Sequence, residues 1–184
     1  MITSSSSIVI IQDYAGINDA GPVNEISILG NGFFVVQDPA TNESYATQAG
    51  HFSLDCNGYL VTGDGARLRG RTGGARSALG DIRINVAGSP PAAAPDASLM
   101  CYSIDDWGKI TVHLSDGTSF LRGQIMLQNF RDPEALVNEG NNLYSNLSAA
   151  NPLPAMAAPG SKGLGAIQWG LLELASAGST NWTN

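Results

Sequence analysis

The sequence predicts a mainly β protein, a compact domain of short antiparallel strands and hairpins with one short helix near residues 132–140. Glycine is frequent, at 22 of 184 residues, and charged residues make up only 14% of the chain. Such a composition suits short strands joined by tight turns better than long surface helices, which usually carry many Glu and Lys residues. Apolar extended stretches also alternate with Asn-Gly, Asp-Gly and Pro-rich turn signals along the chain.

The first part of the chain contains three expected extended stretches. The opening SIVIIQDYAG (residues 7–16) is an apolar run that predicts a buried or half-buried strand, followed by turn residues. Residues 24–38 predict two short strands with a bend at residues 30–32, because glycine weakens the interior of a strand. Tyr45 begins another extended run.

Three hairpins are expected next. Asn57-Gly58 separates two extended stretches and is a strong hairpin signal, because both residues accept a positive φ. A second hairpin should turn near residues 106–108, since it repeats the order of an aliphatic residue, Asp, two residues, Gly and a second aliphatic residue. The third should turn at Asp116-Gly117. Prolines and small residues at positions 87–98 predict a surface loop.

One helix of about two turns is expected at residues 132–140. Asp132 can cap its amino end, and Pro133 suits the first helical position because its missing N–H is not needed there. Gly140 can end the helix in the left-handed region of backbone space. These local signals together favour helix over strand at this place.

The end of the chain is less clearly patterned. Residues 166–177 are ambiguous between a last strand and an amphipathic helix, and we favour the strand. Gly165 and Gly170 would each cost about 1 kcal/mol inside a helix. We expect one β-rich domain over residues 1–177, followed by a C-terminal tail at residues 178–184.

The distribution of charge excludes one class of partner and suggests another. The net charge is −7 and the isoelectric point is near 4.5, so binding of nucleic acid over the surface is not expected. The arginines nevertheless gather in one segment, which is either a solvated strand face or a basic patch that meets an acidic surface on an identical neighbour. The candidate subunit-interface residues are Arg67, Arg69, Arg71 and Arg76, with Arg83 at the end of the segment.

The two cysteines and the apolar runs limit the cellular context. Cys56 and Cys101 could form one bridge, but we expect free thiols, since two cysteines do not make a disulfide framework. No apolar run approaches the ~18 residues that a membrane span needs, so no membrane insertion is expected. The first residues also lack the basic and apolar regions of a cleaved secretory signal.

A possible catalytic group occurs where His51, Asp55 and Cys56 lie within six residues. A Cys–His nucleophilic pair needs the thiolate within hydrogen-bond reach of the imidazole. On an extended arm His51 and Asp55 share one face, whereas Cys56 lies on the other. We therefore interpret Asp55 as a turn residue that binds local amides, and not as part of a catalytic site.

The remaining candidates for chemistry are weaker. His113 alternates with apolar residues and is expected on the polar face of a half-exposed strand. Ser53 and Ser115 could be combined with the two histidines, but no nucleophile-elbow motif supports them. The histidine and cysteine spacing does not fit a zinc site, and no phosphate-binding glycine motif is present. We expect no enzyme activity, no metal or other cofactor and no small-molecule substrate.

Several blocks in the right order resemble the bacterial flagellar hook and basal-body rod protein family. They cover about residues 8–177. The blocks are G-x-G-F-F-x-V at residues 30–36, Y-x-T-x-x-G-x-F at 45–52, L-D-x-x-G-Y-L-V-T at 54–62, G-x-N-L-Y at 140–144, and the glycine-rich segment with the following strand at 158–176.

This resemblance implies a structural subunit of the flagellar hook or basal-body rod. Such subunits leave the cell through the flagellar type III export channel without a cleaved signal. They stack helically, with identical subunits and neighbouring axial proteins as partners, into a hollow structure that transmits torque for motility. The alternative from a different class is a secreted β-rich carbohydrate- or protein-binding module, whose loops would carry the function.

Two departures from the family pattern are visible. Family members begin and end with long amphipathic helical segments, which the sequence does not show at either end. The stretch from residue 79 to residue 109 is short and carries no additional outer domain of the kind that many hook proteins insert. The second feature suits a rod-like or minimal hook subunit, and the sequence does not separate these two.

Overall fold

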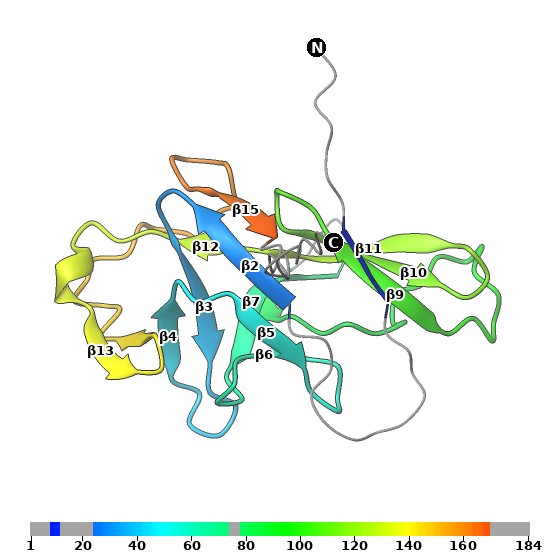
Figure 1. Ribbon diagram of the computed structural model, residues 1–184, viewed down its shortest axis with the longest axis horizontal. Coiled ribbons are helices and arrows are strands. Elements are labelled where there is room, and N and C mark those ends of the chain that lie inside the picture. Colours follow the sequence, from blue (N-terminus) through cyan, green and yellow to red (C-terminus); the bar gives the residue numbers. More distant parts are fainter. Residues whose placement is uncertain (1–7, 12–23, 74–77, 170–184) are drawn as a thin grey trace, which may run out of the picture.

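The computed structural model describes residues 8–11, 24–73 and 78–169, and in these ranges it is almost entirely β (Figure 1). The strands join into one 15-stranded antiparallel sheet whose main path runs β1-β9-β10-β11-β7-β3-β4-β14-β13. The strands are β1 (Ile8–Ile11), β2 (Asn24–Leu29), β3 (Phe33–Gln37), β4 (Ser44–Thr47), β5 (His51–Leu54), β6 (Leu60–Val61), β7 (Arg67–Thr72), β8 (Ala78–Asp81), β9 (Leu99–Ile104), β10 (Lys109–Leu114), β11 (Ser119–Ile125), β12 (Leu127–Gln128), β13 (Val137–Gly140), β14 (Leu143–Ser145) and β15 (Ala166–Trp169). The predicted fold class is confirmed.

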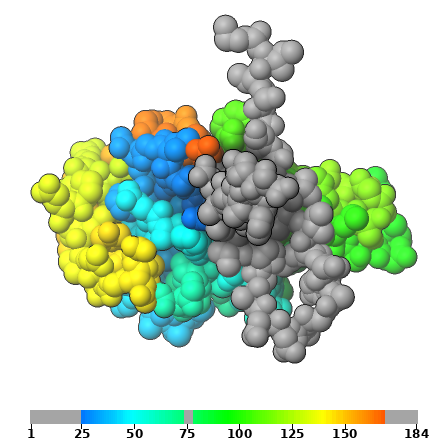
Figure 2. All heavy atoms as spheres, in the orientation of Figure 1, coloured from blue at the N-terminus to red at the C-terminus, as the bar shows by residue number. Residues whose placement is uncertain are grey.

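The sheet gives the molecule two distinct ends. Strands β9, β10 and β11 project to one side, while the β13–β14 hairpin lies at the opposite side, with β2, β3, β5 and β7 between them (Figure 1). Figure 2 shows the same arrangement in atoms, with the β13–β14 region in yellow and the projecting strands in green. Surfaces near the two ends of the strand order are therefore well separated.

The main core lies inside the curl of the sheet, and strands such as β7 and β10 supply it with residues two apart. In β10 every second side chain is buried, the period expected for a strand with one face on a core. Phe34, Leu68, Tyr102 and Ile125 are fully buried there. Burying a side chain of this size contributes roughly 1.5–3 kcal/mol each.

A second, smaller cluster lies on the opposite face of β3. It contains Ala46, Phe130 and Ala150, with Phe33 and Tyr144 packed against it. The Phe33 ring meets Phe130 edge-on at 5.5 Å between centroids, an arrangement that aromatic pairs favour. Because Phe34 faces the main core, β3 is covered on both faces and carries a nearly continuous apolar run.

The expected bend between β2 and β3 is confirmed. Gly30 and Gly32 have φ values of 120° and 126°, a region that residues with a side chain rarely adopt. A Cβ on Gly30 would also lie 3.2 Å from the Cα of Gly165. The glycines therefore serve both the backbone conformation and the close approach of the segment that leads into β15.

The three predicted hairpins form. In the first, Asp55 N donates to Tyr59 O at 2.9 Å, and Gly58 N donates to Asp55 O at 2.9 Å. This is a three-residue loop in which only Gly58 has a positive φ, here 82°. Asn57, which also accepts a positive φ, keeps an ordinary conformation because the loop has a third residue.

The repeated Asp-x-x-Gly order produces the same turn twice. Asp55 Oδ1 accepts from the backbone N of Tyr59 at 2.8 Å, and Asp105 Oδ1 accepts from that of Lys109 at 2.8 Å. Gly108 takes the positive-φ place with φ 75°. Each carboxylate thus binds local amides, as expected of Asp in turns.

The helix predicted at residues 132–140 is not formed. Only a 3-10 helix, η1 (Pro133–Ala135), is present, and Asp132 makes no capping bond with its side chain. Residues from Val137 onward instead form β13, which pairs with β14 across a tight turn at Asn141 and Asn142, both with positive φ. Two positive φ values at the centre of a two-residue turn match the twist of a hairpin. Pairing with β14 therefore replaced the local helical preference.

The loop at residues 87–98 contains no strand and is anchored at its end. Ala94 N donates to Asp116 Oδ2 at 2.7 Å and Ser98 N donates to Ser115 Oγ at 3.1 Å, so the β10–β11 turn holds it. The final strand is confirmed as β15, paired with β2. Residues 170–184 lie outside the described ranges. No helix within those ranges has the length and apolar character that crossing a membrane requires.

Candidate interaction surface

Strand β7 presents its arginines on the outer face of the sheet. Leu68 and Gly70 are buried toward the core, so Arg67, Arg69 and Arg71 alternate onto the other side. The exposure rises along the strand, from half-buried at Arg67 and Arg69 to exposed at Arg71. Arg67, Arg69 and Arg71 therefore lie on one face of the strand, and their role at a subunit interface stays a prediction. Arg76 lies outside the described residues.

The carboxylate of Asp81, at the end of β8, accepts hydrogen bonds from two of these arginines. Arg69 Nη1 donates to Asp81 Oδ1 at 2.8 Å, and Arg67 Nη1 donates to Asp81 Oδ2 at 3.4 Å. Arg69 Nη1 also donates to Gln37 Oε1 on β3 at 2.5 Å. Arg67 and Arg69 are thus engaged within the molecule and tie β8 to β7 and β3. Asp81 could not be predicted as their partner, since only the β7–β8 register brings it there.

Tyr59 adds a stacking contact to the same cluster. The Arg67 guanidinium lies 4.0 Å from the centroid of the Tyr59 ring, and that of Arg83 lies 5.3 Å away. A guanidinium over an aromatic face is attracted by the negative face of the ring. Arg83 Nε also donates to the backbone oxygen of Asn57 at 2.8 Å. The Arg83 side chain therefore stabilises the turn of the β5–β6 hairpin.

A further arginine, which sequence reading did not single out, lies nearby on β11. Arg122 Nε donates to Asn85 Oδ1 at 2.9 Å. Partial burial, followed by the nearby positive charge of Arg83, lowers the pKa of Arg122. Arg71 differs from the others, because within the described residues no hydrogen bond or ion pair engages its side chain.

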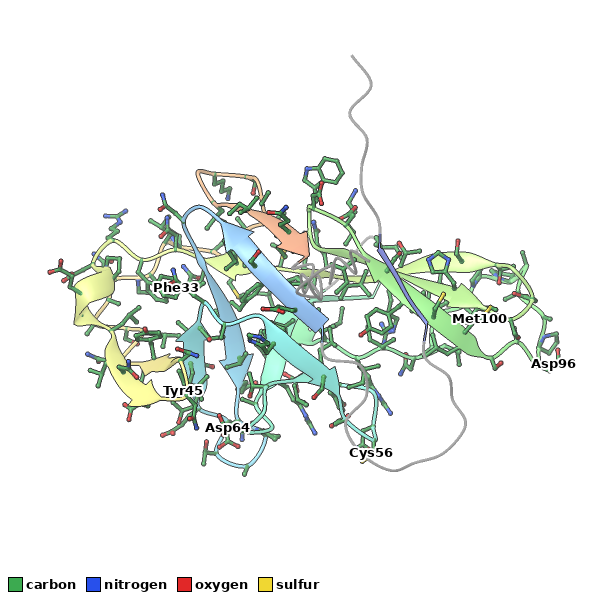
Figure 3. All side chains as sticks on the ribbon, viewed as in Figure 1. Phe33, Tyr45, Cys56, Asp64, Asp96 and Met100 are labelled. Carbon is green, nitrogen blue, oxygen red and sulfur yellow. The ribbon has the colours of Figure 1, made fainter. Side chains whose placement is uncertain are left out.

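The residues that first suggested a catalytic group are separated. His51 is exposed and pairs with Glu25 Oε1 at 3.2 Å, while the carboxylate of Asp55 is occupied by turn amides. Cys56 is exposed in the turn itself (Figure 3). Both cysteines are free, as expected, with Cys101 buried. These side chains therefore do not form a nucleophile and base pair.

His113 has a specific neighbour. Its Nε2 lies 3.2 Å from the hydroxyl of Ser103, which is buried on the adjacent strand β9. The pair lies on the face of β10 opposite to Ile110 and Val112, as the alternation predicted. Neither Ser53 nor Ser115 contacts a histidine in the described part of the chain.

Neither a metal centre nor a deep cleft marks the described surface. Among the described residues, no group of three or more His, Cys, Asp or Glu side chains could hold a metal ion. A shallow polar hollow lies beside the β13–β14 hairpin, where Asn141 Nδ2 donates to Asp64 Oδ1 at 3.2 Å. Its lining is mostly small and polar, with His51 and Leu143 as the larger side chains, whereas small-molecule sites are lined largely by apolar and aromatic side chains.

The sequence of this chain is similar to the sequences of known proteins. The family described as the flagellar hook protein FlgE/F/G D1 domain matches residues 27–112, which contain the strands from within β2 into β10. The chain is also similar to the flagellar basal-body rod protein FlgG of Bacillus subtilis (strain 168), with 30% identity over 97% of the chain. The chain belongs to the flagellar hook and basal-body rod protein family.

Hook relatives share a smaller part of the sequence. The flagellar hook protein FlgE of Brucella abortus is 40% identical over 46% of the chain, and that of Escherichia coli is 27% identical over 74% of the chain. The chain spans 61% of the length of the Bacillus rod relative, and 22% and 37% of the two hook relatives. The resemblance read from the sequence blocks is thereby confirmed.

Proposed function

We propose that the chain is a structural subunit of the flagellar axial structure and that its place is the basal-body rod. In this role copies stack helically with one another and with neighbouring axial proteins into a hollow structure that transmits torque for motility. The observation that carries the proposal is the alignment with a rod protein over 97% of the chain, against 46% and 74% for the two hook relatives.

The architecture suits a mechanical role. A single curled sheet packed on a main core and a smaller second cluster transmits load through backbone hydrogen bonds and packed side chains, which deform little because protein interiors are close-packed. The polar side chains that resembled a catalytic group support turns and pairs instead. The function proposed here therefore needs no catalysis, no cofactor and no small-molecule substrate, and it places the protein in the flagellum after export without a cleaved signal.

The test is deletion of the gene in its own organism, followed by electron microscopy of purified hook–basal bodies. We expect the deletion strain to be non-motile and to lack a completed rod, and we expect the wild-type gene to restore both. Gold-labelled antibody against the protein should mark the rod of intact particles. Normal basal bodies in the deletion strain would overturn the proposal, while complete rods without hooks would move the subunit to the hook.

A matched variant guards against indirect effects. Leu68→Asp places a charge in the core and should abolish complementation, because an unpaired buried charge unfolds the domain. Met100→Asp changes a side chain that is 58% exposed and should still support a rod. Binding of a glycan or of an unrelated protein by the folded domain, together with intact basal bodies in the deletion strain, would support the alternative of a secreted binding module.

A further inference from the structure

An uncompensated basic row crosses four strands on the outer face of the sheet. Lys109 on β10 is opposite Gln124 on β11, Gln124 is opposite Arg71 on β7, and Arg71 is opposite Leu79 on β8. Residues opposite one another in a ladder point to the same face. Lys109 and Arg71 are exposed, and no described carboxylate pairs with either of them. We name Lys109, Gln124, Arg71 and Leu79 the basic row.

The neighbouring arginines increase the positive charge of the row. Arg67 and Arg69 share the single carboxylate of Asp81, so four cations on this face are balanced by one acid. Gln124 Nε2 donates to Trp107 O at 2.9 Å, which holds the amide between the two free cations. The row therefore offers a flat surface with excess positive charge and an exposed aliphatic side chain at one end.

An acidic rim lies on the β3–β4 loop and β13, on the opposite side of β7 from β11 in the strand order. Glu43 accepts from the Tyr45 hydroxyl at 2.9 Å, and Glu139 on β13 accepts from the Ser145 hydroxyl. Asp38 accepts from Ala40 N at 2.7 Å. No described cation pairs with these three carboxylates. We name Asp38, Glu43, Glu139 and Tyr45 the acidic rim (Tyr45 is labelled in Figure 3).

A second observation indicates that the three carboxylates all influence the hydroxyl of Tyr45. The pKa of Tyr45 is raised first by its hydrogen bond to Glu43 and then by desolvation, with smaller contributions from the negative charges of Glu43, Asp38 and Glu139. The rim is therefore a concentrated negative surface. It occurs on the β3–β4 loop and β13, whereas the basic row crosses β10, β11, β7 and β8.

We propose that the acidic rim of one copy docks on the basic row of the next copy. This rests on the proposed function, and it assigns the surface by which copies meet. The two surfaces differ and lie in different parts of the strand order, so the contact is head-to-tail and leaves one row and one rim free for further copies. Opposite excess charge favours this pairing and opposes row-to-row and rim-to-rim contacts.

This assignment refines the arginine set expected from the sequence. Arg71 carries the contact together with Lys109, while Arg67 and Arg69 support the face through Asp81. Arg76 stays a candidate from the sequence alone. The partner in this contact is a second copy of the same chain.

Zero-length crosslinking tests the contact on the purified protein. A water-soluble carbodiimide joins a carboxylate directly to a lysine amine, and the lysines of this chain are Lys109 and Lys162. An equal mixture of ¹⁵N-labelled and unlabelled protein separates bonds between copies from bonds within one copy by mass spectrometry. We expect mixed-isotope peptides that join Lys109 to Glu43, Glu139 or Asp38. The yield should fall as salt is raised, because the Debye length shortens from ~30 Å at 0.01 M to ~3 Å at 1 M.

Lys162 provides the matched control. Lys109→Arg keeps the charge but removes the reactive amine and should abolish these peptides, whereas Lys162→Arg should leave them unchanged. Crosslinks between copies that run only through Lys162, or no crosslinks between copies at low salt, would overturn the contact.

A charge exchange gives an independent readout. One variant carries Arg71→Glu and Lys109→Glu, and the other carries Glu43→Lys and Glu139→Lys. Each variant alone should associate about tenfold less than wild type by sedimentation at low salt, because its row and rim repel each other. An equal mixture should recover association, since each surface then meets one of opposite charge. Lack of recovery, with urea midpoints close to wild type, would overturn the proposal.

These outcomes are separate from the proposed function. The crosslinking and exchange measurements use only the purified protein, whereas the place of the subunit is tested in cells by deletion and labelling. A labelled rod together with failed charge exchange would retain the structural role and reject this surface. Crosslinking through Lys109 together with normal basal bodies in the deletion strain would retain the contact and reject the place in the rod.

Discussion

Gly50 and Ile26 approach so closely that a Cβ on Gly50 would lie 1.6 Å from the carbonyl oxygen of Ile26. The amide of Ile26 in turn donates to Gly50 O at 3.0 Å. This contact joins the start of β5 to β2 next to Phe52, which is fully buried. Only a residue without a side chain fits here, so the glycine of the Y-x-T-x-x-G-x-F block is required for packing.

We predict that Gly50→Ala destabilises the protein by about 3 kcal/mol or more, because overpacking against a backbone atom forces β2 and β5 apart. Gly63→Ala is the matched control, since no atom lies within 4 Å of its added Cβ. It should change the free energy of unfolding by less than about 1 kcal/mol. Urea unfolding of both variants measures the difference. Equal midpoints would show that the Gly50 contact relaxes without cost.

The turn carboxylates should matter for stability and not for chemistry. We predict that Asp55→Ala costs about 1–2 kcal/mol, because two backbone amides lose their acceptor. Asp55→Asn keeps a side-chain oxygen and should retain most of the stability. The same pair of substitutions at Asp105 should behave alike, since its turn has the same hydrogen bonds. Thermal unfolding would contradict this reading if Asn and Ala were equally damaging at either position.

Asp116 should give a pH-dependent contribution to stability. Hydrogen bonds from the Thr118 hydroxyl, then from the amides of Ala94 and Thr118, lower the pKa of this carboxyl below its ordinary 3.8. The folded state therefore binds the proton less readily than the unfolded state. The contribution is complete above pH 3.8 and is lost as pH falls through the lower folded-state pKa.

Carboxyl NMR titration checks the pKa directly. Asp116→Asn should remove this part of the pH dependence of the urea midpoint while leaving the remainder in place. Since Asp116 holds Ala94, the amide of Ala94 should also exchange faster in the variant. A titration midpoint at or above 3.8 would contradict the prediction.

The two thiols should differ strongly in reactivity. Cys56 is exposed at the tip of the β5–β6 turn, whereas Cys101 is buried on β9. We predict that a thiol reagent modifies Cys56 in the native protein at the rate of a free thiol, and Cys101 far more slowly, because the thiol must be uncovered first. Cys56→Ser should remove the fast phase, and denaturant should equalise the two rates. Two fast thiols in the native protein would contradict the burial of Cys101.

The turn that raised the question of an active site was predictable in part. Local hydrogen bonding of Asp55 follows from residue chemistry, because a short carboxylate reaches amides a few positions away. The three-residue loop geometry was not predictable from Asn57-Gly58, since the length of the loop depends on the register of β5 and β6. The same signal therefore placed the hairpin correctly and left its turn type open.

The sequence by itself determined the β class and the places of the three hairpins, because period-2 burial and turn conformations depend on neighbouring residues. Tertiary structure decided the rest. Residues 137–140 became a strand because β14 supplied hydrogen bonds that a short helix could not match. Arg67 and Arg69 found Asp81, and Arg71 stayed free, only through the β7–β8 register. Such pairings depend on contacts distant along the chain, which local residue preferences do not encode.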